Sequence, residues 1–132
     1  MRINSRLWIL ALPLCATIGI ASAAGQSRAT DRVMRQKLAV SQKILEAVVT
    51  SRWADLEASS RELADLTADP GWAVLKKPEY AQHSKTFRDT VEALHTAAAQ
   101  RDLEAAPKAY VAMTLSCVEC HRYLARNRLA HE

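Results

Sequence analysis

The sequence contains few of the residues that β-folds, flexible regions and large aromatic cores require. Of its 132 residues three are Gly and four are Pro, and aromatic side chains make up 5%. No segment alternates polar and apolar residues over the length of a strand, which excludes a β-sandwich or barrel. Apolar residues, mostly Ala and Leu, make up 49% of the chain, which excludes intrinsic disorder and favours helices. We therefore expect one all-α domain.

The charged residues show no excess that would point to nucleic acid or to a charged substrate. Lys and Arg number 18 and Asp and Glu number 14, so the formal net charge is +4, and the basic residues are scattered along the chain. This distribution argues against nucleic-acid binding. The sequence also lacks an acid–base pair, an activated nucleophile and a phosphate-binding loop. We accordingly do not expect an enzyme.

The N-terminus differs in composition from the rest of the chain. Arg2 and Arg6 precede an apolar run over residues 7–20, and the small-x-small pattern of a cleavage site follows at residues 21–23. A basic start, an apolar run and small residues in this order are typical of a secretory signal peptide. We therefore predict that residues 1–23 are a bacterial-type signal peptide and that the protein is periplasmic or secreted.

The mature domain would then span residues 24–132. The apolar run is short for a membrane span and contains Pro13, so we expect no stable span after cleavage, and an uncleaved anchor is the alternative. Cleavage also removes Cys15, one of the three Cys in the sequence. Both remaining Cys lie within one short motif.

Four segments of the mature chain repeat apolar residues every three or four positions, as amphipathic helices do. We expect the first to begin at a cap at Thr30 or Asp31, the second to end before the turn at residues 69–71, and the third to begin at residues 78–79. Pro107 either kinks the fourth helix or delays its start to residues 104–106. The residues expected to face the core are Met34, Leu38, Ser41, Leu45 and Val48, with Val33, Ile44 and Val49 widening this face; Trp53, Leu56, Leu63 and Leu66; Tyr80, Phe87, Val91, Leu94 and Ala98; and Leu103, Ala106, Tyr110, Met113, Cys117, His121 and Leu124.

Helices of this length with mostly short connections predict an antiparallel up-down-up-down four-helix bundle. The longer connection, residues 68–79, contains Trp72, Val74 and Leu75. Because these side chains are apolar, we expect the connection to fold over one end of the core, with Trp72 as a core residue.

The motif that indicates chemistry is Cys117-Val118-Glu119-Cys120-His121. It matches C-x-x-C-H, the attachment pattern of c-type haem. Thiols three positions apart on a helix can each add to one vinyl group of the same porphyrin, and the next residue directs an imidazole toward the iron. The motif predicts one covalently attached haem c, with Cys117 and Cys120 as the thioether residues and His121 as the proximal iron ligand.

Three other uses of these residues remain open. A thioredoxin-like redox pair uses C-x-x-C, but it occurs in a βαβ context that the sequence lacks. A zinc site would need a further ligand from His83, His95 or His131, none of them at ligand spacing. A disulfide between Cys117 and Cys120 would close a very short loop in a helix and stabilise little.

The run from Ser116 to Tyr123, together with residues 34–38 near the start, resembles the cytochrome c′ superfamily and its small exported c′-like members in bacteria. The resemblance extends over nearly the whole mature sequence and implies a four-helix bundle whose first helix crosses the distal face of the haem. Members carry a basic residue four positions after the haem His, whereas Ala125 occupies that position here and Arg126 follows it. This departure argues against five-coordinate, nitric-oxide-binding behaviour.

The resemblance also implies that one side chain of the first helix decides the coordination of the iron. We predict Met34 as the distal ligand, with Leu38 as the neighbour that would occupy the site if Met34 packs in the core. Met113 lies on the helix of the attachment motif and is expected in the core. Basic residues that can pair with haem propionates are Arg35, Lys37, Arg122 and Arg126.

The expected function is that of a periplasmic monohaem c-type cytochrome that carries single electrons between redox partner proteins. The alternative is a five-coordinate haem protein that binds or senses nitric oxide or carbon monoxide. A third interpretation is a haem-bearing accessory subunit that docks on a larger enzyme. The resemblance is compatible with a homodimer packed through helices.

Overall fold

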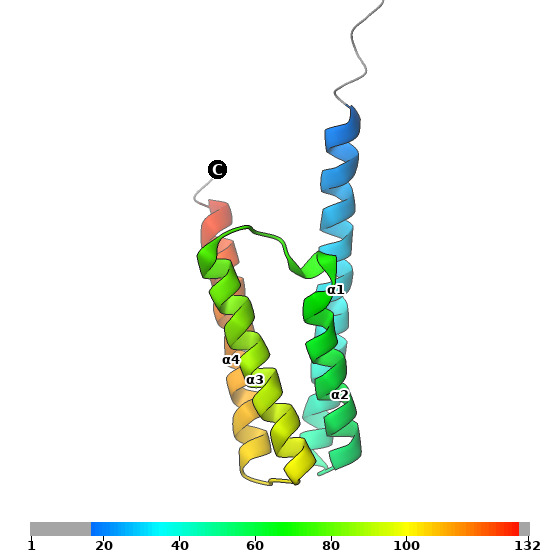
Figure 1. The fold of residues 1–132 in the computed structure, drawn as a ribbon, viewed down its shortest axis with the longest axis vertical. Coiled ribbons are helices and arrows are strands. Elements are labelled where there is room, and N and C mark those ends of the chain that lie inside the picture. Colours follow the sequence, from blue (N-terminus) through cyan, green and yellow to red (C-terminus); the bar gives the residue numbers. More distant parts are fainter. Residues whose placement is uncertain (1–16, 130–132) are drawn as a thin grey trace, which may run out of the picture.

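The structure is a computed structural model that describes the backbone of residues 17–129 and the side chains of residues 25–127. It contains no strand in this range and consists of helices, which confirms the all-α class (Figure 1). The elements are α1 (Thr17–Val49), α2 (Trp53–Asp65), the short 3-10 helices η1 (Leu66–Ala68) and η2 (Pro70–Trp72), α3 (Pro78–Gln100) and α4 (Ala105–Leu129). The first 16 residues of the predicted signal peptide, Cys15 among them, lie outside the described residues, as does His131.

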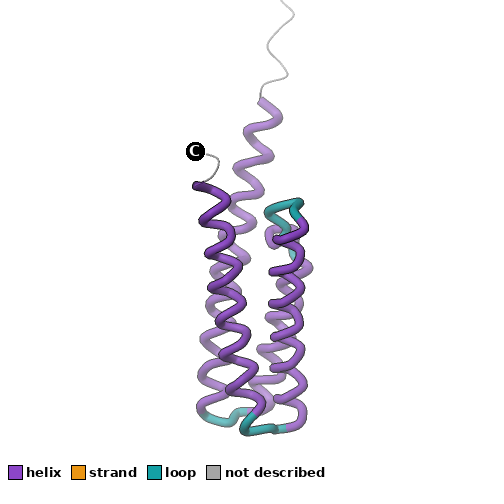
Figure 2. Tube along the Cα trace, turned by 90° about the vertical axis from the view of Figure 1, so that its left-hand side faces the viewer, coloured by secondary structure: helices purple, strands orange, loops and turns teal. Residues whose placement is uncertain are grey.

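Each helix packs against the next one in the chain, and α4 also approaches α1. The chain turns at one end of the molecule after α1 and after α3, and the longer connection between α2 and α3 lies at the other end (Figure 2). Among the neighbouring helix pairs, α1 and α4 make the least contact. The space between α1 and α4 is therefore the least filled part of the bundle.

The start of α1 differs from the prediction. Thr30 does not cap the helix but lies within it, where its Oγ1 donates a hydrogen bond to the Gln26 carbonyl at 3.0 Å. Asp31 also lies inside α1, so neither predicted cap begins a helix. The physical reason is that residues 17–30 contain four Ala and no Pro, and the helix continues through Gly19 and Gly25 without a residue that would break it outright.

The boundaries of the later helices agree with the prediction. Pro78 opens α3, which ends at Arg101 in the left-handed conformation, with φ 53°. Asp102 then caps α4, because one carboxylate oxygen accepts hydrogen bonds from the backbone N–H groups of Glu104 and Ala105, each at 2.9 Å. Pro107 lies in the first turn of α4, where it removes no intrahelical hydrogen bond.

The buried face of α1 is centred one residue away from the centre of the face that the apolar pattern predicts. Val33 and Ile44, which were expected at the edge of that face, are buried, whereas Val49 is 74% exposed. Its buried residues are Val33, Lys37, Val40, Ile44 and Ala47. In the predicted face, by contrast, Leu38 is 62% exposed, Leu45 is 44% exposed, and the side chains of Met34, Ser41 and Val48 are only partly buried. One residue corresponds to about 100° around a helix, so the predicted face borders the core instead of filling it.

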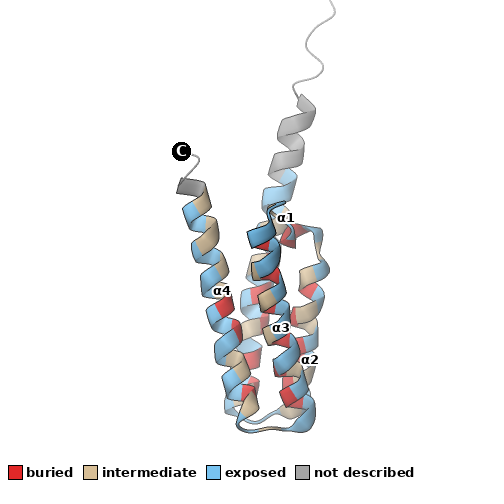
Figure 3. Cartoon of the chain, turned by 60° about the vertical axis from the view of Figure 1, so that its left-hand side comes forward, coloured by how far each residue is buried: buried red, intermediate tan, exposed pale blue. Residues whose placement is uncertain are grey.

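The segment formed by α2 and η1 and the helix α3 bury most of their predicted residues (Figure 3). Of the residues predicted for the core from α4, only Ala106 and Met113 are buried, while Cys117 and Leu124 are partly buried and His121 is exposed. Those confirmed in the core are Leu56, Leu63, Leu66, Tyr80, Phe87, Val91, Leu94, Ala98, Ala106 and Met113. Trp53 and Tyr110 pack against this core from partly exposed positions. Leu103 is 68% exposed because it belongs to the turn before α4 rather than to the helix.

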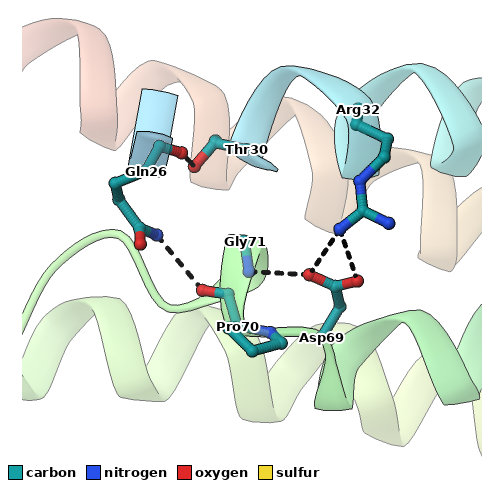
Figure 4. A network of polar contacts seen from close by, with 6 residues as sticks. All are labelled: Gln26, Thr30, Arg32, Asp69, Pro70 and Gly71. Carbon is teal, nitrogen blue, oxygen red and sulfur yellow. Dashed lines mark hydrogen bonds and ion pairs between the residues drawn. The ribbon is translucent and has the colours of Figure 1, made fainter. Parts of the chain in front are cut away.

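The connection between α2 and α3 is held against α1 by polar contacts (Figure 4). The Arg32 guanidinium forms an ion pair with Asp69 at 2.9 Å, and the Gln26 side-chain amide donates to the Pro70 carbonyl at 3.1 Å. Asp69 also accepts a hydrogen bond from the Gly71 backbone N–H at 2.7 Å. These contacts fix η2 on the surface of α1.

Close packing of η2 on α1 places Trp72 in the core. A Cβ at Gly71 would come within 2.6 Å of the Ala29 carbonyl oxygen, so a residue with a side chain does not fit there without a shift. The Trp72 indole is buried, lies 5.1 Å from the Phe87 ring between centroids, and donates to the Ser84 hydroxyl at 3.2 Å. The expected core position of Trp72 is therefore confirmed.

Candidate functional site

Two adjoining cavities of about 500 and 560 Å³ lie between α1 and α4. Each is of the size that small-molecule and cofactor sites usually have. Asp31, Met34 and Lys37 of α1 and His121 of α4 line both of them. These four residues therefore mark the boundary where the two cavities meet.

The attachment motif lies along the α4 wall of the cavities. Cys117 lines the first cavity, Cys120 lines the second, and His121 borders both. Both thiols are free. Since residues three positions apart on a helix point about 60° apart, one helix directs one thiol into each cavity, and the His121 imidazole lines both.

The facing wall is the side of α1 that the sequence pattern predicts for the core. Met34 lines both cavities, and Leu38 and Ser41 line the first. Met34 is partly buried and also packs against the core cluster. The structure thus brings Met34 and His121 to the same two cavities from opposite helices, and it places Leu38 beside them.

Aromatic side chains from three elements complete the walls. Trp72 of η2 and Tyr80 of α3 line the second cavity, and Tyr110 of α4 lines the first. The Tyr80 hydroxyl donates a hydrogen bond to the Trp72 carbonyl. No local pattern marks Trp72 and Tyr80 as site residues, because their approach to α4 depends on how the connection between α2 and α3 packs. Met113 is buried at the base of the first cavity, in its expected core position.

The electrostatic environment affects the two titratable groups of the motif differently. Desolvation raises the pKa of the Cys120 thiol, an effect that the nearby Lys37 ammonium partly opposes. Although His121 is exposed as a residue, desolvation by the surrounding protein atoms lowers its pKa below 6.5, and Lys37 lowers it further. The neutral imidazole, which has a free nitrogen lone pair for a metal, is therefore favoured at neutral pH.

Lys37 is one of the basic residues predicted to pair with haem propionates, but its burial was not predicted. Its side chain is buried, with 7% exposed, and Nζ lies 3.9 Å from the centroid of the Phe87 ring and 4.7 Å from that of Trp72. Both distances are in the range of cation–π contacts. Within the described part of the chain, Nζ forms neither a hydrogen bond nor an ion pair. The sequence signal for this position was available, because Lys37 follows the buried Val33 by four residues.

Of the His residues that the structure describes, His83 and His95 line neither of these cavities. The His83 ring packs on Tyr123 with centroids 5.0 Å apart, and His95 Nε2 lies 3.9 Å from a carboxylate oxygen of Glu57. Across residues with described side chains, no three His, Cys, Asp or Glu gather as a metal-binding group would. For the zinc interpretation, His83 and His95 are thus not brought to the motif.

Comparison with known proteins gives no match: no protein-family model, no curated protein and no solved structure corresponds to this chain. In the part of the chain that the structure describes, none of the helices has the length and apolarity that crossing a membrane requires. The residues around the two cavities are thus the basis for assigning a function.

Proposed function

We propose that the chain is an exported monohaem c-type cytochrome of the c′-like kind that carries single electrons between redox partner proteins. The observation that carries this proposal is the position of the C-x-x-C-H motif on the cavity wall. Cys117, Cys120 and His121 of α4 border the same two cavities as Met34 of α1. A motif that occurred by chance would have no reason to line a cofactor-sized space.

The chemistry of the cavity walls fits a haem group. Two free thiols, a neutral imidazole and a thioether line the cavities, and Leu38 adds an apolar side chain that is 62% exposed. These are the donor types that hold haem c. When bound, haem supplies one-electron chemistry between the ferric and ferrous states of its iron.

Each residue has a distinct role in this proposal. Cys117 and Cys120 each add across a vinyl group, so that a sulfur–carbon bond forms and the thiol proton goes to the other vinyl carbon. His121 is the proximal ligand, and its lowered pKa keeps the imidazole available. Met34 is the distal ligand, and a Met ligand raises the reduction potential.

Export is part of the same proposal. Free thiols in the periplasm become oxidised unless another bond holds them. Covalent attachment to haem uses both Cys of the predicted mature chain, residues 24–132. We therefore expect the purified protein to begin near residue 24 and to carry the mass of one haem.

One observation favours the gas-binding alternative. Met34 packs against the core cluster, and Leu38 lines the first cavity next to it. If the Met34 side chain keeps its packing role, the sixth coordination position is open to nitric oxide or carbon monoxide. The two functions therefore differ in what Met34 does.

The test is the absorption spectrum of the purified holoprotein, with and without carbon monoxide, for wild type, Met34→Leu and Met113→Leu. We expect sharp low-spin bands and no carbon monoxide binding for wild type and for Met113→Leu, since Met113 lies on the helix of the motif. We expect Met34→Leu to become high-spin and to bind carbon monoxide.

If the wild-type protein is already high-spin and binds carbon monoxide, the result would support the gas-binding function and contradict electron transfer. Absence of covalent haem from the protein expressed with the cytochrome c maturation machinery would overturn both. Mass spectrometry of the same preparations distinguishes these results.

A further inference from the structure

Lys37 is the buried basic residue among the side chains that the structure describes. Its ammonium lies over two aromatic rings at the point where the two cavities meet. Burial of a charge without an opposite charge is unfavourable, and cation–π contacts offset this cost in part. A cavity wall with a buried positive charge that is not paired with a carboxylate is complementary to an anionic ligand.

Three Lys residues on the described surface form ion pairs with carboxylates, unlike Lys37. Lys43 pairs with Glu62, Lys85 with Asp89 and Lys108 with Glu104, and all six side chains are well exposed. Such pairs are solvated and weak. Lys37 instead lacks a carboxylate among the described residues within ion-pair distance and is withdrawn from solvent.

Asp31 and Arg35 also border the cavities, so that the charge differs from one end of the α1 wall to the other. Asp31 lines both, six positions before Lys37 and therefore about 9 Å away along the axis of α1. Arg35 lines the first cavity but is exposed. A carboxylate on a ligand is repelled near Asp31 and attracted near Lys37, so the α1 wall favours one orientation of an acidic ligand.

We propose that Lys37 binds a carboxylate of the ligand held between α1 and α4. This inference rests on the proposed function, in which that carboxylate is a haem propionate. Of the four basic residues that the sequence offers for this role, Arg35, Arg122 and Arg126 are exposed, and burial selects Lys37. Lys37 is thereby a positioning residue that sets the direction of the acidic edge of the porphyrin.

The experiment compares reversible binding of haemin and of haemin dimethyl ester, whose propionates carry no charge. The host is the full chain with Cys117→Ala and Cys120→Ala, so that attachment does not mask affinity. Soret titrations are made in this host and in the same host with Lys37→Met, Lys37→Arg or Lys43→Met. Met is chosen because it matches the length of Lys and keeps contact with aromatic rings.

We expect the host to bind haemin about tenfold more tightly than the ester, the effect of one charge-assisted hydrogen bond. Lys37→Met should reduce this preference by about the same factor. Lys37→Arg should retain most of the preference because it keeps the charge. Lys43→Met should leave it unchanged, since Lys43 is exposed and pairs with Glu62 at 3.4 Å.

A second measurement uses the covalent holoprotein, so that the result does not depend on how the Cys variants fold. The propionate bending band in the resonance Raman spectrum should shift in Lys37→Met and stay in place in Lys43→Met.

The outcomes separate the two proposals. Equal affinity for haemin and the ester, a preference that survives Lys37→Met, or an unmoved Raman band overturns the role of Lys37 and leaves the cytochrome intact. A change of spin state in Lys37→Met would assign the amine to the iron and also overturn it. Failure of both porphyrins to bind, with no covalent haem in wild type, overturns the proposed function itself.

Discussion

The burial of Met34 and Lys37 is the reverse of what their polarity suggests. Met34 is apolar and belongs to the predicted core face, but it borders the cavities, whereas the charged Lys37 lies at a buried position. The buried face of α1 is set by Val33, Val40 and Ile44, which pack against the other helices. Because β-branched and apolar residues occur on two neighbouring faces of α1, the sequence pattern alone does not select between them.

The carboxylate of Asp102 caps the start of α4. Hydrogen bonds from the N–H groups of Ala105 and Glu104 lower the pKa of its carboxyl below 3.8. A lowered carboxyl pKa stabilises the fold above the unfolded value, and this contribution is lost as the pH falls through the folded value. We expect Asp102→Ala to lower the unfolding temperature at neutral pH and to have less effect in acid.

Thermal unfolding followed by circular dichroism from about pH 7 to about pH 2.5 checks this expectation. Glu92→Ala, at an exposed position on α3, is the control and should behave as wild type. An equal loss of stability at both ends of the pH range would show that Asp102 acts through something other than its ionised carboxyl.

At the scale of elements, the helix ends that carry a specific residue signal were predictable. Pro78 and Pro107 occur in first turns, and Asp102 caps α4, because each suits a position where backbone groups lack helical partners. The start of α1 was not predictable from Thr30, since capping residues also occur inside helices when nothing before them interrupts the helix. The rotation of α1 likewise depends on its neighbours.

Gly71 lies where η2 packs closely against α1. A Cβ at this position would meet the Ala29 carbonyl at 2.6 Å and Val33 Cγ2 at 3.0 Å, and both belong to the long helix that η2 packs on. We expect Gly71→Ala to cost about 1–3 kcal/mol of unfolding free energy, as overpacking usually does. The added Cβ would push η2 away from α1 and move Trp72, which lines the second cavity. The affinity of the protein for haem should therefore also fall.

Urea denaturation and haemin titration of the variant measure the two effects. Gly25→Ala is the matched control, because a Cβ at Gly25 has no neighbour within 4 Å among the atoms described. Stability of Gly71→Ala equal to that of the Gly25 control would mean that η2 is not held closely against α1.

At the scale of the whole molecule, the packing is uneven. Contacts between α3 and α4, and of α2 with both α1 and α3, are more extensive than those between α1 and α4. Exposed apolar side chains also occur on α1 and α4, at Leu38 and Leu45 of α1 and at Val111, Leu115 and Val118 of α4. A ligand between α1 and α4 would add the contacts that the protein itself lacks there.

For the proposed haem between α1 and α4, this uneven packing predicts which helices a bound ligand would stabilise. We expect the holoprotein to unfold at a higher temperature than the chain with Cys117→Ala and Cys120→Ala prepared without haem, because ligand bound to the native state stabilises it. Amide hydrogen exchange should slow most in α1 and α4 and least in α2, which contributes no residue to the two cavities. Uniform protection of all four helices, or none, would contradict a site between α1 and α4.

The all-α class, the ends of the later helices and the C-x-x-C-H pattern at Cys117, Cys120 and His121 were recognisable from the amino-acid sequence alone, and we propose that this pattern attaches haem. These follow from local signals: spacing, turn residues and a contiguous motif. Tertiary structure decided which face of α1 is buried, the assembly of a site from α1, η2, α3 and α4, and the burial of Lys37. Each of these depends on contacts between segments far apart in the chain, for which no short pattern in the sequence is sufficient.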